Sequence, residues 1–284
     1  MEHDARLLPP PPGDGLQLLA IAPHPDDAEI GAGGTLALHA ARGYRVGILD
    51  LTRGELGSNG TPEERLAEAE RAAAVLGLAW RGNLGLPDRG LAASSGQVAE
   101  LVRVLRRLRP RVVLLPSPTD AHPDHRAATA LAEEALMSAG LPKWDPATPA
   151  HRVERVLYYF VDPPVHPSLL VDVSGYLEVK MQALRCHASQ FLPGPGRTPT
   201  PSTGGTTWPG WSTRPATWGP RAGGRQRKPL PAEFCRCVPT SSPRRYCAVK
   251  GAPRCREYGG SGRNTLRTGG RPEATGWTAG GRLE

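Results

Sequence analysis

The chain has 284 residues, of which 39% are hydrophobic, 22% are charged and 5% are aromatic, and its formal net charge is +8. This length is sufficient for one α/β domain with a sizeable core. No apolar run approaches the roughly 20 residues that a membrane span needs, and the first residues lack the basic start and apolar stretch of a signal peptide. Composition therefore argues against a membrane-spanning or secreted, disulfide-built protein, and we expect a cytoplasmic one.

The excess positive charge lies entirely in the last part of the chain. Residues 1–200 carry 20 basic and 23 acidic residues, a net charge of −3, whereas residues 201–284 carry 15 basic and 4 acidic residues, a net charge of +11. The larger part of the chain therefore has no electrostatic signature of nucleic-acid binding. We divide the chain into a disordered leader (1–15), a folded domain (16–200) and a basic tail of low order (201–284).

Short apolar runs alternate with helical periodicity from residue 16 onward. Strands are expected at 16–22, 45–51, 80–86, 111–116, 155–161 and 169–173. Helices are expected at 33–42, 61–76, 98–109, 124–139 and 175–189. This alternation predicts a Rossmann-like α/β fold with a mostly parallel sheet and helices on both faces. Ligands bind such sheets in the crevice beyond the carboxyl ends of the strands.

The tail does not continue this pattern. Residues 201–284 contain 15 Gly and 10 Pro but only six Leu, Ile, Val, Met or Phe residues, too few to offset the ordering of the chain. No strand or helix period is visible, and the spacing of the four cysteines fits no zinc site. The composition is typical of a GC-rich gene translated in a shifted frame. A basic tail that binds nucleic acid and a separately folded unit are the alternatives.

A first cluster of His and Asp side chains follows the first expected strand. His24, Asp26 and Asp27 lie in the stretch PHPDDAE, residues 23–29. Two adjacent carboxylates repel each other, so a divalent cation would stabilise them, and a His and an Asp are suitable zinc ligands. The other Asp is then available to act on water. Taken alone, this stretch is also typical of a turn.

A second cluster follows the expected strand 111–116 and begins a helix. His122, Asp124 and His125 lie in the stretch AHPDH, residues 121–125. The two His residues are three positions apart and can face one pocket, and a carboxylate beside them can fix an imidazole tautomer. A His-x-x-His at a helix start is often incidental. Two such clusters at the carboxyl ends of strands together predict one metal site.

The two motifs PHPDDAE and HPDH resemble the zinc-dependent de-N-acetylase family that includes LmbE-like proteins and the N-acetylglucosaminyl-phosphatidylinositol (PIG-L) deacetylases. Three further stretches, DLTRGELGSNGT (50–61), NLGLPDRG (83–90) and SQF (189–191), are similar to the branch that deacetylates N-acetylglucosaminyl malate in bacillithiol biosynthesis. The similarity extends over residues 16–200. It implies a hydrolase that removes the N-acetyl group from an N-acetylglucosamine (GlcNAc) conjugate, an amino-sugar substrate, and a subunit that commonly forms homo-oligomers.

The resemblance also implies one zinc ion per protomer and a role for each matching residue. These roles are zinc ligand for His24, Asp27 and His125, general base for Asp26, oxyanion stabiliser or proton donor for His122, orientation of that imidazole for Asp124, and substrate contact for Arg65. Relatives continue after the SQF stretch with ordered chain that covers the sugar site, whereas this chain enters its tail. A catalytically impaired metal-binding remnant, or a nucleic-acid-associated protein acting through the tail, are therefore the alternatives.

Other motifs predict less. The stretch GAGG at 31–34 lacks the Gly-x-Gly-x-x-Gly spacing and follows acidic residues, so we do not expect it to bind a nucleotide. His39 is expected to be structural, and His166 and His187 belong to no motif. Asp88 and Arg89 either contact the substrate or pair structurally.

Overall fold

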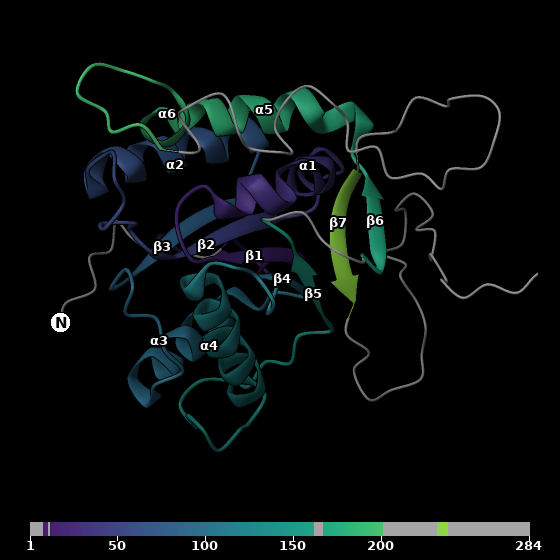
Figure 1. The fold of residues 1–284 in the computed structure, drawn as a ribbon. Helices are drawn as coiled ribbons and strands as arrows, with labels where there is room; N and C mark the ends of the chain where they lie inside the picture. The colour runs from purple at the N-terminus through teal and green to yellow at the C-terminus, as the bar shows by residue number, and fades with distance from the viewer. Residues whose placement is uncertain (1–7, 11, 162–166, 201–231, 238–284) are drawn as a thin grey trace, which may run out of the picture.

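The computed structural model describes residues 8–10, 12–161 and 167–200 and the backbone of residues 232–237 (Figure 1). The strands in this part are β1 (Leu18–Ala22), β2 (Val46–Thr52), β3 (Trp80–Leu86), β4 (Val112–Pro116), β5 (Arg155–Tyr159), β6 (Leu169–Asp172) and β7 (Ala232–Cys237). The helices are α1 (Asp27–Ala41), α2 (Pro62–Leu76), α3 (Ser95–Leu108), α4 (Pro123–Ala139), α5 (Leu177–Cys186) and α6 (Ala188–Phe191), with a 3₁₀ turn at Ser174–Tyr176.

The strands form one sheet in the order β3-β2-β1-β4-β5-β7-β6. The first five are parallel, and β7 is antiparallel to both of its neighbours. Because β1 lies between β2 and β4, the chain reverses its direction of progress across the sheet at β1 and β4. The expected Rossmann-like α/β fold is confirmed, and the loops that follow β1 and β4 meet at the point where such sheets bind ligands.

Two cores lie on opposite faces of this sheet, because successive side chains of a strand point to opposite sides. On β1, Leu19 and Ile21 pack with α3 and α4, whereas Leu18, Ala20 and Ala22 pack with α1, α2 and α5. In Figure 1 the two groups of helices lie above and below the sheet. Strands covered on both faces are near-continuous apolar runs, which is why they were visible in the sequence.

Local sequence signals set the starts of the helices that reach the crevice. Thr61 accepts a hydrogen bond from the backbone N–H of Glu64, with Pro62 at the first position of α2. At α4 the same arrangement uses an imidazole: His122 Nδ1 accepts from the backbone N–H of Asp124, and Pro123 follows the cap. The cap of α4 therefore fixes the orientation of a side chain in the second His/Asp cluster.

The described residues differ from the expected elements at three places. Helix α1 begins at Asp27 rather than Gly33, so the first acidic cluster is part of the helix. Strand β7 lies within the segment 201–284, where no strand was expected; the rest of that segment is outside the described residues. Within the leader, the Pro9 carbonyl accepts hydrogen bonds from Trp80 Nε1 and from Arg107, and the division into leader, domain and tail stays a prediction.

Within the described residues, no helix combines the length and apolar character that crossing a bilayer requires. His166 lies outside the described residues.

Packing of α1 against β5 yields a stability prediction. A Cβ at Gly31 would lie 2.2 Å from Cδ2 of the fully buried Tyr159 and 3.1 Å from the Phe160 carbonyl oxygen. Gly31→Ala should therefore lower the free energy of unfolding by about 1–3 kcal/mol through overpacking, measured by urea denaturation. Gly96→Ala is the matched control, since its Cβ would enter open space on α3. A Gly31→Ala chain as stable as the parent would contradict this packing.

Candidate active site

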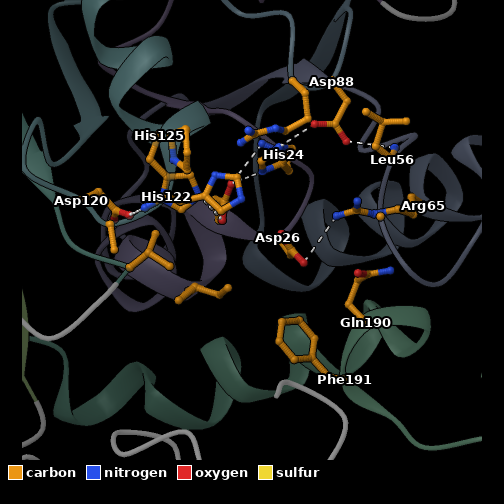
Figure 2. A pocket seen from close by; sticks show the side chains of 17 residues that line it. His24, Asp26, Leu56, Arg65, Asp88, Asp120, His122, His125, Gln190 and Phe191 are labelled. Atoms are coloured by element: carbon orange, nitrogen blue, oxygen red, sulfur yellow. Dashed lines mark hydrogen bonds and ion pairs between the residues drawn. The ribbon is translucent and has the colours of Figure 1, made fainter. Parts of the chain in front are cut away.

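The two His/Asp clusters converge where β1 and β4 end. These strands are paired neighbours, so the loop after β1 and the start of α4 lie side by side at one edge of the sheet. His24 lies in the loop after β1, Asp27 is the first residue of α1, and His125 lies in the first turn of α4. The convergence that the sequence predicted is therefore found in the fold, and Figure 2 shows the imidazoles together at one side of the pocket.

The carboxylate of Asp27 lies between two imidazoles. Its Oδ2 is 3.1 Å from His24 Nδ1, and its Oδ1 is 3.3 Å from His125 Nε2. One donor atom from each of the three residues lies within 4.8 Å of the other two. Metal–ligand bonds of about 2.0–2.3 Å require donor atoms at this kind of spacing, and two His with one carboxylate is a catalytic type of zinc ligand set. The three residues fit a divalent metal ion.

The electrostatics of the cluster also favour a cation. Burial lowers the pKa of His24, but Asp27 and Asp88 outweigh it and raise that pKa to about 10. Burial also lowers the pKa of His125, but Asp27 and Asp120 outweigh burial and raise that pKa to about 10. Without a metal, the site would therefore retain two protonated imidazoles to balance its carboxylates, and a bound cation would take their place.

Asp26 precedes α1 in a strained backbone conformation. Its φ is +122°, a value that non-glycine residues rarely adopt and that costs about 1–3 kcal/mol. Burial raises the pKa of its carboxyl to about 6, although Arg65 opposes that effect. The strain places a carboxylate with a near-neutral pKa beside the metal-ligand cluster, as a general base requires.

Arg65 is buried and engaged with the protein. Its Nη1 donates to the Gly54 carbonyl (3.0 Å), its Nη2 donates to the Pro25 carbonyl (2.7 Å), and Nη2 lies 3.5 Å from Asp26 Oδ2. It lines the cavity, so the substrate contact expected from the sequence remains a prediction. The structure adds that this guanidinium holds the loop around Asp26.

His122 is oriented by Asp124, but not in the manner expected. The backbone N–H of Asp124 donates to His122 Nδ1 (3.2 Å), whereas its carboxylate lies 3.4 Å from His24 Nε2. A neutral His122 that accepts at Nδ1 carries its proton on Nε2. Burial and the two neighbouring imidazoles lower the pKa of His122, which favours this neutral tautomer over the protonated form.

Two further carboxylates support the metal-ligand candidates: Asp120, to which the sequence analysis gave no role, and Asp88, for which it left substrate contact or structural pairing open. Asp120, shortly after β4, lies 3.1 Å from His125 Nδ1 and accepts from the His122 backbone N–H (2.8 Å). Asp88 lies 3.1 Å from His24 Nε2 and accepts from the Leu56 backbone N–H (3.0 Å). Metal-ligating imidazoles commonly donate their second N–H to a carboxylate. The only signal for Asp120 in the sequence was its position just after β4, whereas Asp88 also belongs to the stretch NLGLPDRG.

Donor atoms of His24, Asp88 and Asp124 also lie within 4.8 Å of one another. One imidazole would have to serve two cations if both groups bound metal. The arrangement is better explained by Asp88 orienting His24 toward Asp27 and His125, which leaves one metal site.

A cavity of about 570 Å³ opens above these residues. Its wall includes Leu56, Arg89, and Gln190 and Phe191 of α6. Figure 2 shows Leu56 across the pocket from Phe191. Arg89 is about half exposed and lies 3.9 Å from Asp124, so it both pairs weakly with a carboxylate and faces the cavity. His39 instead lies against the Thr35 carbonyl within α1, as expected of a structural residue.

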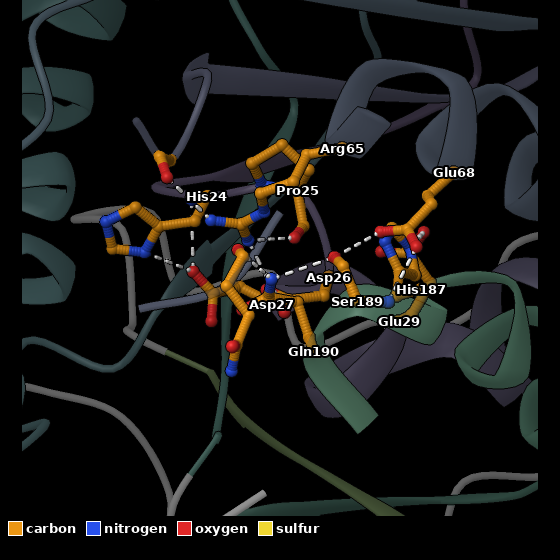
Figure 3. A network of polar contacts seen from close by, with 12 residues as sticks. His24, Pro25, Asp26, Asp27, Glu29, Arg65, Glu68, His187, Ser189 and Gln190 are labelled. Atoms are coloured by element: carbon orange, nitrogen blue, oxygen red, sulfur yellow. Dashed lines mark hydrogen bonds and ion pairs between the residues drawn. The ribbon is translucent and has the colours of Figure 1, made fainter. Parts of the chain in front are cut away.

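A buried charge network behind the site was also missed. Arg81 of β3 donates to Glu29 (2.5 Å) and to both oxygens of Asp50. His187 Nε2 lies 2.9 Å from Glu29, and Figure 3 shows these two side chains together. Burial alone would raise the pKa of Glu29, but Arg81 and His187 hold it well below its usual value. The network ties α1 to β2, β3 and the segment before α6, which makes these elements one support for the site.

Comparison with known proteins shows the family. Residues 19–136 match the model of the GlcNAc-PI de-N-acetylase (PIG-L) family. The diacetylchitobiose deacetylase of Thermococcus kodakarensis is 35% identical over 196 residues, which cover 64% of this chain and 72% of that protein. The chain belongs to the GlcNAc-PI de-N-acetylase family.

Two further proteins are similar to this chain. The 1D-myo-inositol 2-acetamido-2-deoxy-alpha-D-glucopyranoside deacetylase of Saccharomonospora viridis is 30% identical, covering 63% of this chain and 86% of that protein. The solved structure of the conserved protein TT1542 from Thermus thermophilus is 51% identical, with a TM-score of 0.60, and covers 62% of this chain and 80% of that one. PIG-L deacetylases are metal-dependent, which agrees with the donor set at Asp27.

Asp88 yields a prediction about metal affinity. Asp88→Ala should weaken divalent-metal binding about 10- to 100-fold, because His24 loses the carboxylate that orients it; competition with a chromophoric chelator measures this. Glu55→Ala is the control, since Glu55 accepts from the Asp88 backbone N–H but does not contact His24. Equal weakening in both variants would assign the effect to the loop rather than to the imidazole.

Proposed function

We propose that this protein is a zinc-dependent deacetylase that hydrolyses the acetamide of a GlcNAc conjugate, with N-acetylglucosaminyl malate as its substrate. One observation carries the proposal: a carboxylate held between two imidazoles lies beside a second, strained carboxylate, and both face a cavity of about 570 Å³. Two of the proteins named above, the diacetylchitobiose deacetylase and the 1D-myo-inositol 2-acetamido-2-deoxy-alpha-D-glucopyranoside deacetylase, are named for N-acetylated glucosamine compounds, which supports the reaction class.

The proposed ligands are His24, Asp27 and His125. A metal ion bound there supplies a Lewis acid that polarises the acetamide carbonyl and makes water more acidic. Zinc is proposed because two imidazoles and one carboxylate are ligands that zinc prefers.

Asp26 is the proposed general base. As the water oxygen attacks the carbonyl carbon, the carboxylate of Asp26 accepts the water proton. Its pKa of about 6 leaves it mostly ionised at neutral pH while keeping it basic enough for this transfer. When the C–N bond breaks, the same carboxyl can return the proton to the departing amine, and the products are acetate and the free amino sugar.

His122 is the proposed oxyanion stabiliser. Because Asp124 donates to its Nδ1, the neutral imidazole can donate from Nε2 to the negative charge that develops on the carbonyl oxygen. This role uses the neutral form, which agrees with the lowered pKa of His122.

Malate is proposed as the aglycone from the resemblance of the stretches 50–61, 83–90 and 189–191 to the malate-specific branch. The half-exposed guanidinium of Arg89 at the cavity wall provides a positive charge that would attract an anionic aglycone. Neutral conjugates would not use this charge.

Separate roles for adjacent carboxylates yield a prediction. Asp26→Ala should retain zinc and lose turnover by about 10²- to 10⁴-fold, because the base is removed and the ligands remain. His24→Ala should instead lower the zinc content. Metal analysis and acetate release on the same preparations measure both effects. Parent-like turnover in Asp26→Ala would reject its role as the base.

The substrate assignment is tested by acetate release from three compounds. We expect kcat/KM to be higher for N-acetylglucosaminyl malate than for N,N′-diacetylchitobiose or the GlcNAc-inositol compound. Arg89→Gln should remove most of this preference, since neutral substrates do not use the charge. Zinc-loaded protein that releases no acetate from any of the three would identify the chain as an inactive metal-binding remnant.

A further inference from the structure

The side-chain amide of Gln190 is held in a defined orientation. One end of the amide lies 2.7 Å from the Asn59 backbone carbonyl and 2.9 Å from Ser189 Oγ. A backbone carbonyl can only accept a hydrogen bond, so the atom that faces it must be the nitrogen Nε2. Both hydrogens of Nε2 are therefore used within the protein, and the carbonyl oxygen Oε1 must point the other way.

A buried carboxylate fixes the Ser189 end of this arrangement. Glu68, which is 1% exposed, accepts from the Ser189 backbone N–H (2.7 Å) and from Ser189 Oγ (2.6 Å). Since the Ser189 hydroxyl donates to Glu68, its oxygen is available only as an acceptor for Gln190. The resulting chain from Gln190 through Ser189 to Glu68 is visible in Figure 3.

Close packing leaves little room for this chain to rearrange. A Cβ at Gly60 would lie 2.7 Å from Ser189 Oγ, and Gly60 has a φ of +79° that favours glycine. Asn59 is tied to the same segment a second time, because its side chain exchanges hydrogen bonds with the backbone of Thr198. The loop after β2 and the segment around α6 therefore hold each other in place.

Gln190 Oε1 faces the cavity. Gln190 lines its wall, and Figure 2 shows the amide oxygen turned toward Asp26 and the nitrogen turned away from it. Oε1 makes no hydrogen bond within the part of the chain that the structure describes. Phe191 lines the same wall and offers an apolar ring next to this acceptor. A sugar has hydroxyl donors around an apolar ring face, so its hydroxyls can donate to an acceptor such as Gln190 Oε1 while its apolar face packs against a ring such as that of Phe191.

We propose that Gln190 is a specificity-determining residue whose Oε1 accepts a hydrogen bond from one of the 3-, 4- and 6-hydroxyls of the amino sugar. The inference rests on the proposed function for the identity of the sugar. It assigns Ser189 and Glu68 as positioning residues, because they fix the amide and do not reach the cavity themselves. The preformed orientation means that the substrate does not have to order the side chain when it binds.

The test measures binding rather than turnover. The full chain with Asp26→Asn is titrated with methyl 2-acetamido-2-deoxy-α-D-glucopyranoside and with its 3-, 4- and 6-deoxy analogues, followed by calorimetry. Adding Gln190→Leu should weaken binding of the parent sugar about 3- to 10-fold, the loss expected for one neutral hydrogen bond. For one analogue only, Gln190→Leu should not weaken binding further, since that analogue already lacks the hydroxyl that donates to Gln190 Oε1.

Two variants separate recognition from folding. Gln182→Leu makes the same substitution on the exposed side of α5 and should leave the sugar affinity unchanged. Ser189→Ala removes one acceptor of the Gln190 amide and should weaken binding about 2- to 5-fold while keeping the discrimination between analogues. A Ser189→Ala chain with parent-like affinity would overturn the positioning role.

The remaining outcomes are distinct. Equal weakening of all four sugars by Gln190→Leu, unchanged binding, or no binding of any sugar to the parent chain would each overturn the inference. If the parent binds with the expected pattern but the zinc-loaded wild-type chain releases no acetate, the deacetylase proposal fails and the role of Gln190 stands. Titration of the wild type with methyl 2-amino-2-deoxy-α-D-glucopyranoside repeats the test without the Asp26 substitution.

Discussion

The position of one carboxylate, that of Asp27, organises the site. It is the first residue of α1, and each of its oxygens faces a different imidazole, one from the loop after β1 and one from α4. These elements come from segments about 100 residues apart in the sequence and meet only because β1 and β4 are neighbours in a parallel sheet. A buried carboxylate between the buried imidazole of His125 and the partly buried imidazole of His24 is stable only if positive charge accompanies it, supplied by protons or by a metal ion.

The surrounding charges have different tasks. Asp88 and Asp120 face the outer nitrogens of His24 and His125, which directs the inner nitrogens toward Asp27. Arg65 donates to the Pro25 carbonyl, directly before Asp26, and to the Gly54 carbonyl of the loop after β2, and so supports a residue whose backbone is strained. Strain of this kind persists only where surrounding contacts over-determine it, and it is found most often at functional sites.

The fold and the centre of the site were largely predictable because their signals are local. Strands that are covered by helices on both faces are continuous apolar runs in the sequence, and the His and Asp residues of the two clusters lie shortly after such runs. The start of α1 was not predictable in this way, because the glycines at 31–34 have low helix propensity. Their helical conformation depends on tertiary packing, for example on the close contact between Gly31 and Tyr159. From the sequence alone, Arg81 is expected to be a surface residue of a weak strand. Its partners Glu29 and Asp50 are 52 and 31 residues away, so no local pattern indicates the buried network. The orientation of Gln190 was equally hidden, since it depends on Asn59, Ser189 and Glu68 together.

The central claim is that His24, Asp27 and His125 hold a single catalytic metal ion. Anomalous diffraction at the zinc absorption edge, from crystals of the full chain grown with zinc, tests it most directly. We predict one strong peak per chain that lies within bonding distance of a nitrogen of each imidazole and of the Asp27 carboxylate. A peak bound instead by Asp88 and Asp124, or no zinc at this end of the sheet, would contradict the account.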